Sequence, residues 1–190
     1  MSKIKKPIIL GVLFLLPVIF LLFLYPSTHN YNPLDIVKGD TQELTDFESF
    51  SDVNVQLENQ ITVLGFLGNN PNQEALTALN LKELIYDKFQ GFKKFQVVII
   101  VSDKAEESTK LLKKELNQYK ELKYWRFVFG TEEEIIKIYN TLRVEEPLNA
   151  NLASEEVFII DKERSQRGRL DDREDNEKEK NMNKENKCSD

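Results

Sequence analysis

The fold is decided by residues 61–74, which read ITVLGFLGNNPNQE. The first seven are almost continuously apolar and rich in β-branched side chains, which is typical of a strand that is covered on both faces. Asn70 and Pro71 then fit the N-cap and the first position of a helix, and Gln73 fits the position of a capping-box partner. The sequence therefore predicts a central strand that turns directly into a helix.

The same succession of strand and helix repeats along the chain. Buried strands are predicted at 95–101, 124–129 and 157–161, and helices after the first two run to Tyr119 and Leu142. The predicted capping pairs are Asp103 with Glu106 and Thr131 with Glu134. Residues 166–170 can pair with the last strand as an antiparallel hairpin. Strands that alternate with helices predict an α/β fold, a central mixed sheet flanked by helices.

The composition sets the limits of this domain. Residues 26–52 are rich in Pro, Asn, Asp and Ser, and predict a linker. The domain is expected over 53–171, opening with a short half-buried strand at 53–57 in which apolar and polar residues alternate. The last segment, 172–190, has Met182 and Cys188 as its apolar residues and predicts a charged tail, either a solvated helix or disordered.

The first thirty residues predict a membrane anchor. Residues 7–29 carry no formal charge, and the nineteen residues 7–25 would reach about 28 Å as a helix, close to the thickness of a bilayer core. An uncleaved anchor is favoured over a cleaved signal because no small-residue cleavage site follows the apolar run. The lysines among residues 1–6 place that end in the cytoplasm and the domain on the extracytoplasmic, periplasmic side.

Charge and residue counts exclude several kinds of function. The 190 residues carry a net charge of -6, of which +3 comes from residues 1–6 and zero from 162–190, so residues 30–161 carry -9. A domain this acidic is a poor candidate for binding nucleic acid. One cysteine, Cys188, and one histidine, His29, exclude an intramolecular disulfide and a Cys/His metal cluster within one chain.

Several strings resemble the Sco/SenC family, whose fold is thioredoxin-like. Residues 124–135 (YWRFVFGTEEEI) are similar to the segment where a tryptophan strand of that family ends in a turn before a helix. Residues 157–161 (VFIID) and 166–171 (QRGRLD) are similar to its late strand and arginine-glycine hairpin. The resemblance implies an anchored, exported domain of the kind that binds copper or reduces thiols for the copper centre of cytochrome c oxidase.

The chain departs from the family where the chemistry would lie. The family's Cys-x-x-x-Cys motif falls on residues 70–74, so Asn70 and Glu74 occupy the cysteine positions, and no histidine occurs in 143–156. Amide and carboxylate oxygens suit neither Cu(I) nor disulfide exchange. We therefore expect no catalytic residue, cofactor or metal ligand. Asn70 with Glu74 is either an oxygen-ligand or general acid/base site, or an ordinary helix cap with a first-turn carboxylate.

Four further residues are candidates for a functional role. Arg167 and Arg169 flank a glycine on the predicted hairpin, where they could clamp an anion or a partner's carboxylate, or stabilise an edge strand. Trp125 shares a strand face with two phenylalanines, and core packing is favoured over recognition. Cys188 could pair with another chain or be incidental.

Together these features favour a non-catalytic accessory factor of the membrane. By resemblance, its protein partner would be an oxidase subunit or a copper-competent Sco relative. Two alternatives stay open: a thiol:disulfide or electron-transfer protein acting through Cys188 or a partner's thiols, and a general envelope interaction module.

Overall fold

The computed structural model describes residues 5–24, 34–50, 54–118 and 121–168. The chain forms two units, residues 1–33 and 34–190. The first contains one helix, α1 (Lys5–Leu24), and its large apolar side chains between residues 10 and 20 are exposed. Among the described residues, no helix combines the length and the apolarity needed to cross a membrane. The anchor predicted at 7–25 stays a prediction.

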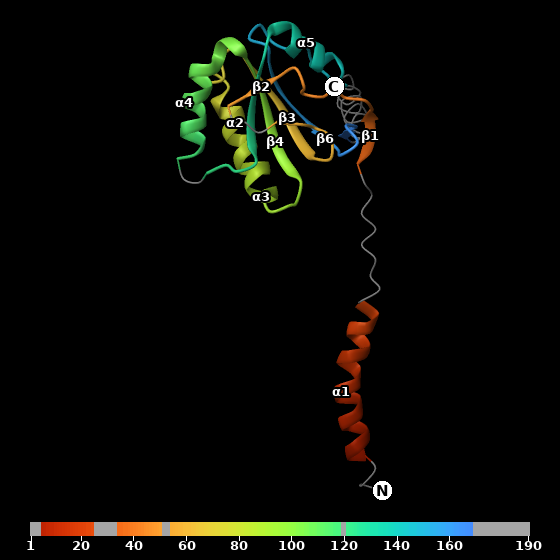
Figure 1. Cartoon of the computed structure of the whole chain (residues 1–190). Helices are drawn as coiled ribbons and strands as arrows, with labels where there is room; N and C mark the ends of the chain where they lie inside the picture. The colour runs from red at the N-terminus through yellow and green to blue at the C-terminus, as the bar shows by residue number, and fades with distance from the viewer. Residues whose placement is uncertain (1–4, 25–33, 51–53, 119–120, 169–190) are drawn as a thin grey trace, which may run out of the picture. The chain divides into compact units, whose positions relative to one another are not determined.

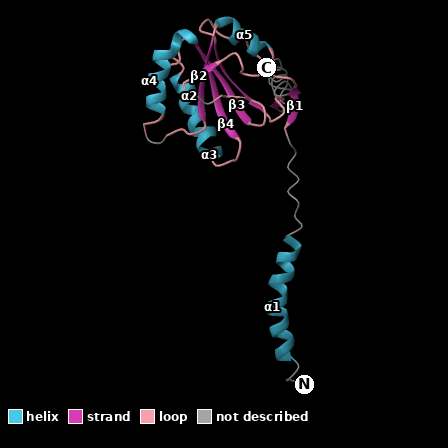
Figure 2. Ribbon diagram, viewed as in Figure 1, coloured by secondary structure: helices cyan, strands magenta, loops and turns pink. Residues whose placement is uncertain are grey.

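The second unit is built on one seven-stranded sheet with the order β1-β7-β6-β3-β4-β5-β2 (Figures 1 and 2). The strands are β1 (Asp35–Lys38), β2 (Glu48–Ser49), β3 (Ile61–Gly68), β4 (Phe95–Ser102), β5 (Trp125–Gly130), β6 (Ala153–Ile160) and β7 (Gln166–Gly168). The helices are α2 (Ala75–Leu81), the π-helical η1 (Lys82–Tyr86), α3 (Asp87–Phe89), the 3-10 turn η2 (Asp103–Ala105), α4 (Glu106–Leu116) and α5 (Glu132–Asn140).

The strand directions give the mixed sheet that the sequence predicted. β3, β4 and β5 run parallel, whereas β6 pairs antiparallel with β3, and β7 pairs antiparallel with β6. Residues 62–68 of β3 are buried, as expected for a strand covered on both faces. A central strand that leads into a helix, with one parallel and one antiparallel neighbour and a terminal antiparallel hairpin, is a thioredoxin-like α/β arrangement. The predicted fold class, an α/β fold with a central mixed sheet, is confirmed.

Side chains on the two faces of the sheet form two separate cores. One core joins the inward faces of α2 and α4 to the sheet, and the other joins α5 to the opposite face. Trp125 and Phe127 of β5 enter the first core, whereas Val128 enters the second. This confirms the predicted alternation, and Trp125 is buried in the core.

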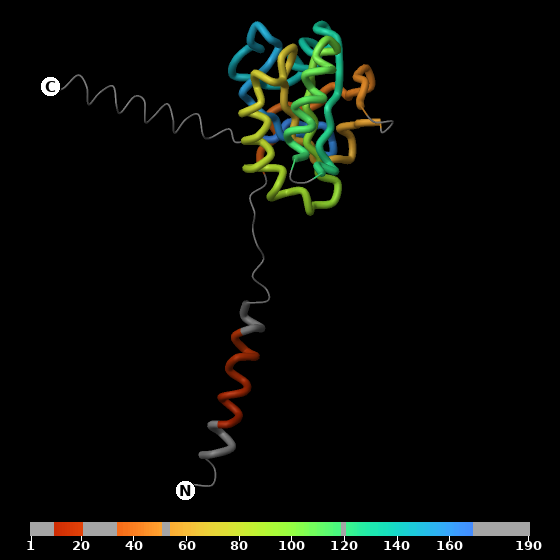
Figure 3. Tube along the Cα trace, turned by 90° about the vertical axis from the view of Figure 1, so that its left-hand side faces the viewer, coloured from red at the N-terminus to blue at the C-terminus, as the bar shows by residue number. Residues whose placement is uncertain are grey.

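The second core includes a segment that the sequence assigned to the linker. Leu44 is buried in it and Phe47 packs against it. The Glu43 carboxylate accepts hydrogen bonds from the backbone N–H groups of Leu44, Leu57 and Glu58, at 3.0, 2.6 and 3.0 Å. Figure 3 shows this orange segment and the yellow coil of α2 on opposite sides of the domain.

The linker predicted over 26–52 therefore extends too far, because residues 34–50 belong to the domain. Their few apolar residues show no sustained helix or strand period, so their burial could not be predicted from the sequence. The strand predicted at 53–57 is also absent over the described residues 54–57. Its alternation still predicted burial correctly, since Val55 and Leu57 are buried while Asn54 and Gln56 are exposed.

The predicted helix caps are confirmed in one case and corrected in another. The capping box of α5 is present, with Thr131 N–H donating to Glu134 at 2.7 Å and Glu134 N–H donating to the Thr131 hydroxyl at 3.4 Å. Before α4, Ser102 rather than Asp103 accepts the cap bond, from Lys104 N–H. A 3-10 turn follows, and α4 ends at Leu116 rather than Tyr119.

Truncation of Leu44 tests whether the segment before residue 54 is part of the core. We expect Leu44→Ala to lower the free energy of unfolding by about 2 to 5 kcal/mol, because it leaves a cavity in a closely packed core. Urea unfolding followed by circular dichroism measures this change. The control is the exposed neighbouring substitution Thr45→Ala, which should change stability by less than about 0.5 kcal/mol. Equal stability of the two variants would mean that the segment is a linker after all.

Candidate functional site

The turn after β3 is shaped by a close approach between two backbone segments. Gly68 ends β3 with a φ of 54°, in the left-handed region that side chains other than glycine rarely adopt. A Cβ atom at this position would overlap the carbonyl oxygen of Asn151. Gly68 is therefore required both by its dihedral angle and by the contact with the loop at 149–152.

Amide groups join this loop to the turn. Asn69 N–H donates to the carbonyl oxygen of Asn151 at 2.7 Å, and the Asn151 side-chain amide donates to Gln73 Oε1 at 3.2 Å. Within the loop, Asn149 Oδ1 accepts hydrogen bonds from the backbone N–H groups of Asn151 and Ala153, at 2.9 and 3.0 Å. The turn is thus braced from the loop that precedes β6.

This bracing changes where the helix begins. Gln73 N–H donates to the carbonyl oxygen of Asn70, and Ala75 N–H to that of Asn72, so residues 70–75 form overlapping turns. The helix α2 begins at Ala75, with Glu74 as an N-cap whose side chain makes no cap bond. The N-cap predicted at Asn70 is therefore wrong. The prediction fails because the 149–152 loop binds the Gln73 side chain, which a capping box with Asn70 would need.

The structure thus places Asn70 and Glu74, onto which the resemblance would place the family's cysteines, in one short turn at the end of the central strand. Oxygen and amide nitrogen atoms line the described part of this turn. Within residues 5–24, 34–50, 54–118 and 121–168, no group of three or more His, Cys, Asp or Glu side chains is placed to hold a metal ion. The arrangement can form hydrogen bonds, and it offers neither a thiolate nor a soft metal ligand.

Asn149 and Asn151 are site residues that the sequence reasoning missed. A signal was present nonetheless, because two asparagines two positions apart, directly before a strand, are typical of a tight loop with side-chain to backbone bonds. What the sequence could not give is the partner of that loop, since Gln73 lies 78 positions earlier in the chain than Asn151.

The second candidate group does not lie at the turn. Arg167 is in β7, an interior strand, and its Nε donates to Asp161 Oδ2 at 2.6 Å. Its Nη1 also donates to the carbonyl oxygen of Leu34 at 3.1 Å, which ties β1 to the sheet. Arg167 therefore has a structural role here. Arg169, Cys188 and His29 lie outside the described residues.

Comparisons with known proteins give only distant likenesses. No protein-family model matches the chain, and no curated protein matches it in sequence. The thioredoxin domain of a thiol-disulfide oxidoreductase from Bacteroides vulgatus is 14% identical, with a TM-score of 0.47, over 74% of this chain and 89% of that one. The C-terminal domain of an uncharacterized protein from Bacteroides fragilis is 20% identical, with a TM-score of 0.46, over 74% and 94% of the two chains.

A third solved structure is the soluble domain of Sco1 from Bacillus subtilis. It is 17% identical, with a TM-score of 0.41, over 73% of this chain and 84% of that one. The assignment of the fold rests on the strand order described above.

Substitution of Gly68 tests the close approach at the turn. We expect Gly68→Ala to lower the free energy of unfolding by more than about 2 kcal/mol, because it adds both backbone strain and an overlap with the 149–152 loop. The matched control is Gly91→Ala, whose Cβ would meet nothing within 4 Å, and a change below about 1 kcal/mol is expected there. Urea unfolding measures both. Similar losses in the two variants would contradict the contact.

Proposed function

We propose that this chain is a membrane-anchored, extracytoplasmic protein of the Sco/SenC type that lacks redox and copper-binding residues. It serves as a non-catalytic accessory factor in cytochrome c oxidase assembly or copper delivery. The observation that carries the proposal is the turn after β3. Asn70 and Glu74 occupy the positions where the family has cysteines, and the turn is braced by the amides of Gln73 and Asn151.

Chemistry at this turn supports a binding role over catalysis. Thiol-disulfide exchange requires a thiolate, and Cu(I) prefers sulfur ligands, whereas the turn supplies amide and carboxylate oxygens. The sheet nevertheless carries a hydrophobic core on each of its two faces. A folded domain without the atoms for the family's chemistry is best suited to contact another protein, such as an oxidase subunit or a copper-competent relative.

The membrane anchor is supported by the first 25 residues. Residues 7–25 are uncharged, and lysines precede them. Where the side chains of α1 are described, the apolar ones are exposed on all sides of the helix rather than on one stripe. A helix that is apolar all round belongs in an apolar surrounding, of which a bilayer is one. The positive N-terminus favours an extracytoplasmic domain.

Cu(I) competition tests the loss of the metal site. We expect the chain to take no more Cu(I) from a competing chelator than an unstructured control peptide takes. The double substitution Asn70→Cys and Glu74→Cys, made in a Cys188→Ser background, should restore Cu(I) binding, because it returns two thiolates to the turn. Cu(I) binding by the wild-type chain that is as tight as the binding restored in the double variant would overturn the proposal.

Purification in mild detergent tests the accessory role. We expect the tagged full chain to retain oxidase subunits or their assembly factors, and Cys188→Ser to retain them equally well, because the contact is made by the folded domain. Recovery of neither class of protein would favour a general envelope interaction module. Disulfide reduction that is lost in Cys188→Ser would show that the chain is an enzyme.

A further inference from the structure

Two exposed phenylalanines lie at the end of the sheet opposite to the turn after β3. Phe89 is 44% exposed and Phe92 is 60% exposed, and their ring centroids are 5.8 Å apart. The Phe89 ring also lies 6.1 Å from the buried Phe95, which packs beside Tyr86. Phe92 N–H donates to the carbonyl oxygen of Phe89 at 3.0 Å. The exposed rings are therefore held in place by the core.

Lysines flank these two phenylalanines in the sequence. Residues 88–94 read KFQGFKK, and Lys88, Lys93 and Lys94 are all exposed. The exposed Lys123 and Lys162 lie at the same end of the sheet, because β4 and β5 begin there and the antiparallel β6 ends there. Exposed acidic residues also lie at this end, namely Asp40, Glu58, Glu121 and Glu163. The excess of positive charge therefore belongs to residues 88–94, which carry three lysines and no acidic residue. Asp87 is paired with Lys82 at 2.8 Å.

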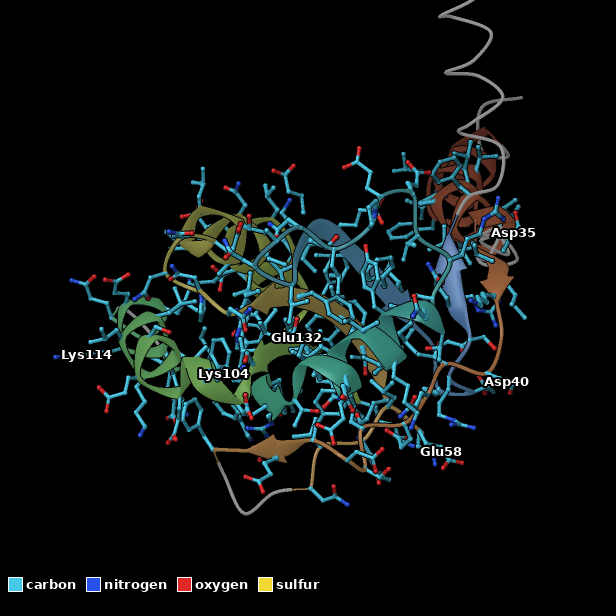
Figure 4. All side chains as sticks on the ribbon, turned by 90° about the horizontal axis from the view of Figure 1, so that it is seen from above. Asp35, Asp40, Glu58, Lys104, Lys114 and Glu132 are labelled. Atoms are coloured by element: carbon cyan, nitrogen blue, oxygen red, sulfur yellow. The ribbon has the colours of Figure 1, made fainter. Side chains whose placement is uncertain are left out.

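The other end of the sheet has the opposite charge. β4 and β5 end in acidic residues there, with Asp103, Glu132 and Glu133 exposed and Lys104 as the neighbouring cation. Figure 4, which looks onto the domain from above the view of Figure 1, labels Lys104 and Glu132. Figure 1 shows α3 at the lower end of the domain and α5 at the upper end. The cationic segment 88–94 and these acidic residues therefore lie at opposite ends of the parallel strands β4 and β5.

We propose that residues 88–94 dock the domain onto the surface of an anionic phospholipid bilayer. Lysine ammonium groups would meet the lipid phosphates while Phe89 and Phe92 enter the boundary between headgroups and acyl chains. Charge complementarity favours this occupant, because the loop is a cationic and aromatic patch in a region that carries -9 over residues 30–161. The acidic opposite end would be repelled by the same surface.

This inference rests on the anchor in the proposed function. Eight residues separate Tyr25 from Leu34, and an extended chain of that length reaches at most about 28 Å. An anchored domain therefore stays close enough to the bilayer for the loop to reach it. With the loop docked, the turn after β3 faces away from the lipid, because the eight residues of β3 separate the two ends by about 26 Å. The braced turn is then presented to proteins rather than to lipid.

A probe in the loop tests the docking in the full chain. Gly91→Cys in a Cys188→Ser background provides one attachment point, and a side chain at Gly91 meets nothing within 4 Å. The labelled chain is reconstituted into vesicles of phosphatidylglycerol with phosphatidylcholine, and into vesicles of phosphatidylcholine alone. We expect nitroxide-labelled headgroups to quench the probe in the anionic vesicles only. The quenching should fall as salt is raised, because screening weakens the attraction.

Two pairs of substitutions identify the charges responsible. Lys93→Gln with Lys94→Gln should lower the docking equilibrium constant about 30-fold, since each lysine near an anionic surface contributes about 1 kcal/mol. Lys104→Gln with Lys114→Gln removes two exposed lysines elsewhere on the domain and should leave quenching unchanged. Thermal unfolding of each variant confirms that it is folded.

Quenching that is equal in both lipids, or that persists in the Lys93 and Lys94 variant, would overturn the docking. Absence of quenching in both kinds of vesicle would also overturn the docking. It would leave an acidic protein surface as the partner for the loop. Flotation with phosphatidylcholine vesicles tests the anchor separately. A chain that floats with them but shows no anionic preference refutes the docking alone, whereas a chain that does not float refutes the anchor.

Discussion

The pairing of β3 with β4 on one side and β6 on the other places the rest of the second unit. β3 is buried along residues 62–68, so its side chains enter both cores, and its two neighbours run in opposite directions. Any polar side chain on a strand in this position needs a hydrogen-bond partner. Thr62 meets the requirement by accepting a hydrogen bond from the Gln96 side chain of β4 at 2.9 Å. Burial on both faces also explains why this strand was the clearest element in the sequence.

Antiparallel β6 has a second effect, because the loop before it is brought to the end of β3. The left-handed Gly68 and the amides of Gln73, Asn149 and Asn151 follow from that meeting of two backbone segments. In a thiol protein the same position would hold a reactive group near a loop. Here hydrogen-bonded amides fill this position, so the turn keeps a defined shape.

Periodic elements could be predicted from the sequence, and contacts between distant segments could not. The strands from Ile61, Phe95 and Trp125 and the capping box at Thr131 have local signals, namely continuous apolar runs and side-chain spacing. Leu44 lies in the core because Glu43 binds the backbone of residues 57 and 58, a contact with no local signal. The start of α2 was misplaced for the same reason, since the loop that binds Gln73 lies far away in the chain.

The direction of the strands also decides at which end of the sheet the charges that flank β4 and β5 lie. Along the sequence, lysines precede β4 and β5, and acidic residues follow them. In an antiparallel pair these charges would alternate between the two ends and partly cancel. Because β4 and β5 are parallel, the lysines gather at one end and the carboxylates at the other. In the docking proposed above, the end that carries Asn70 and Glu74 is therefore the one left free.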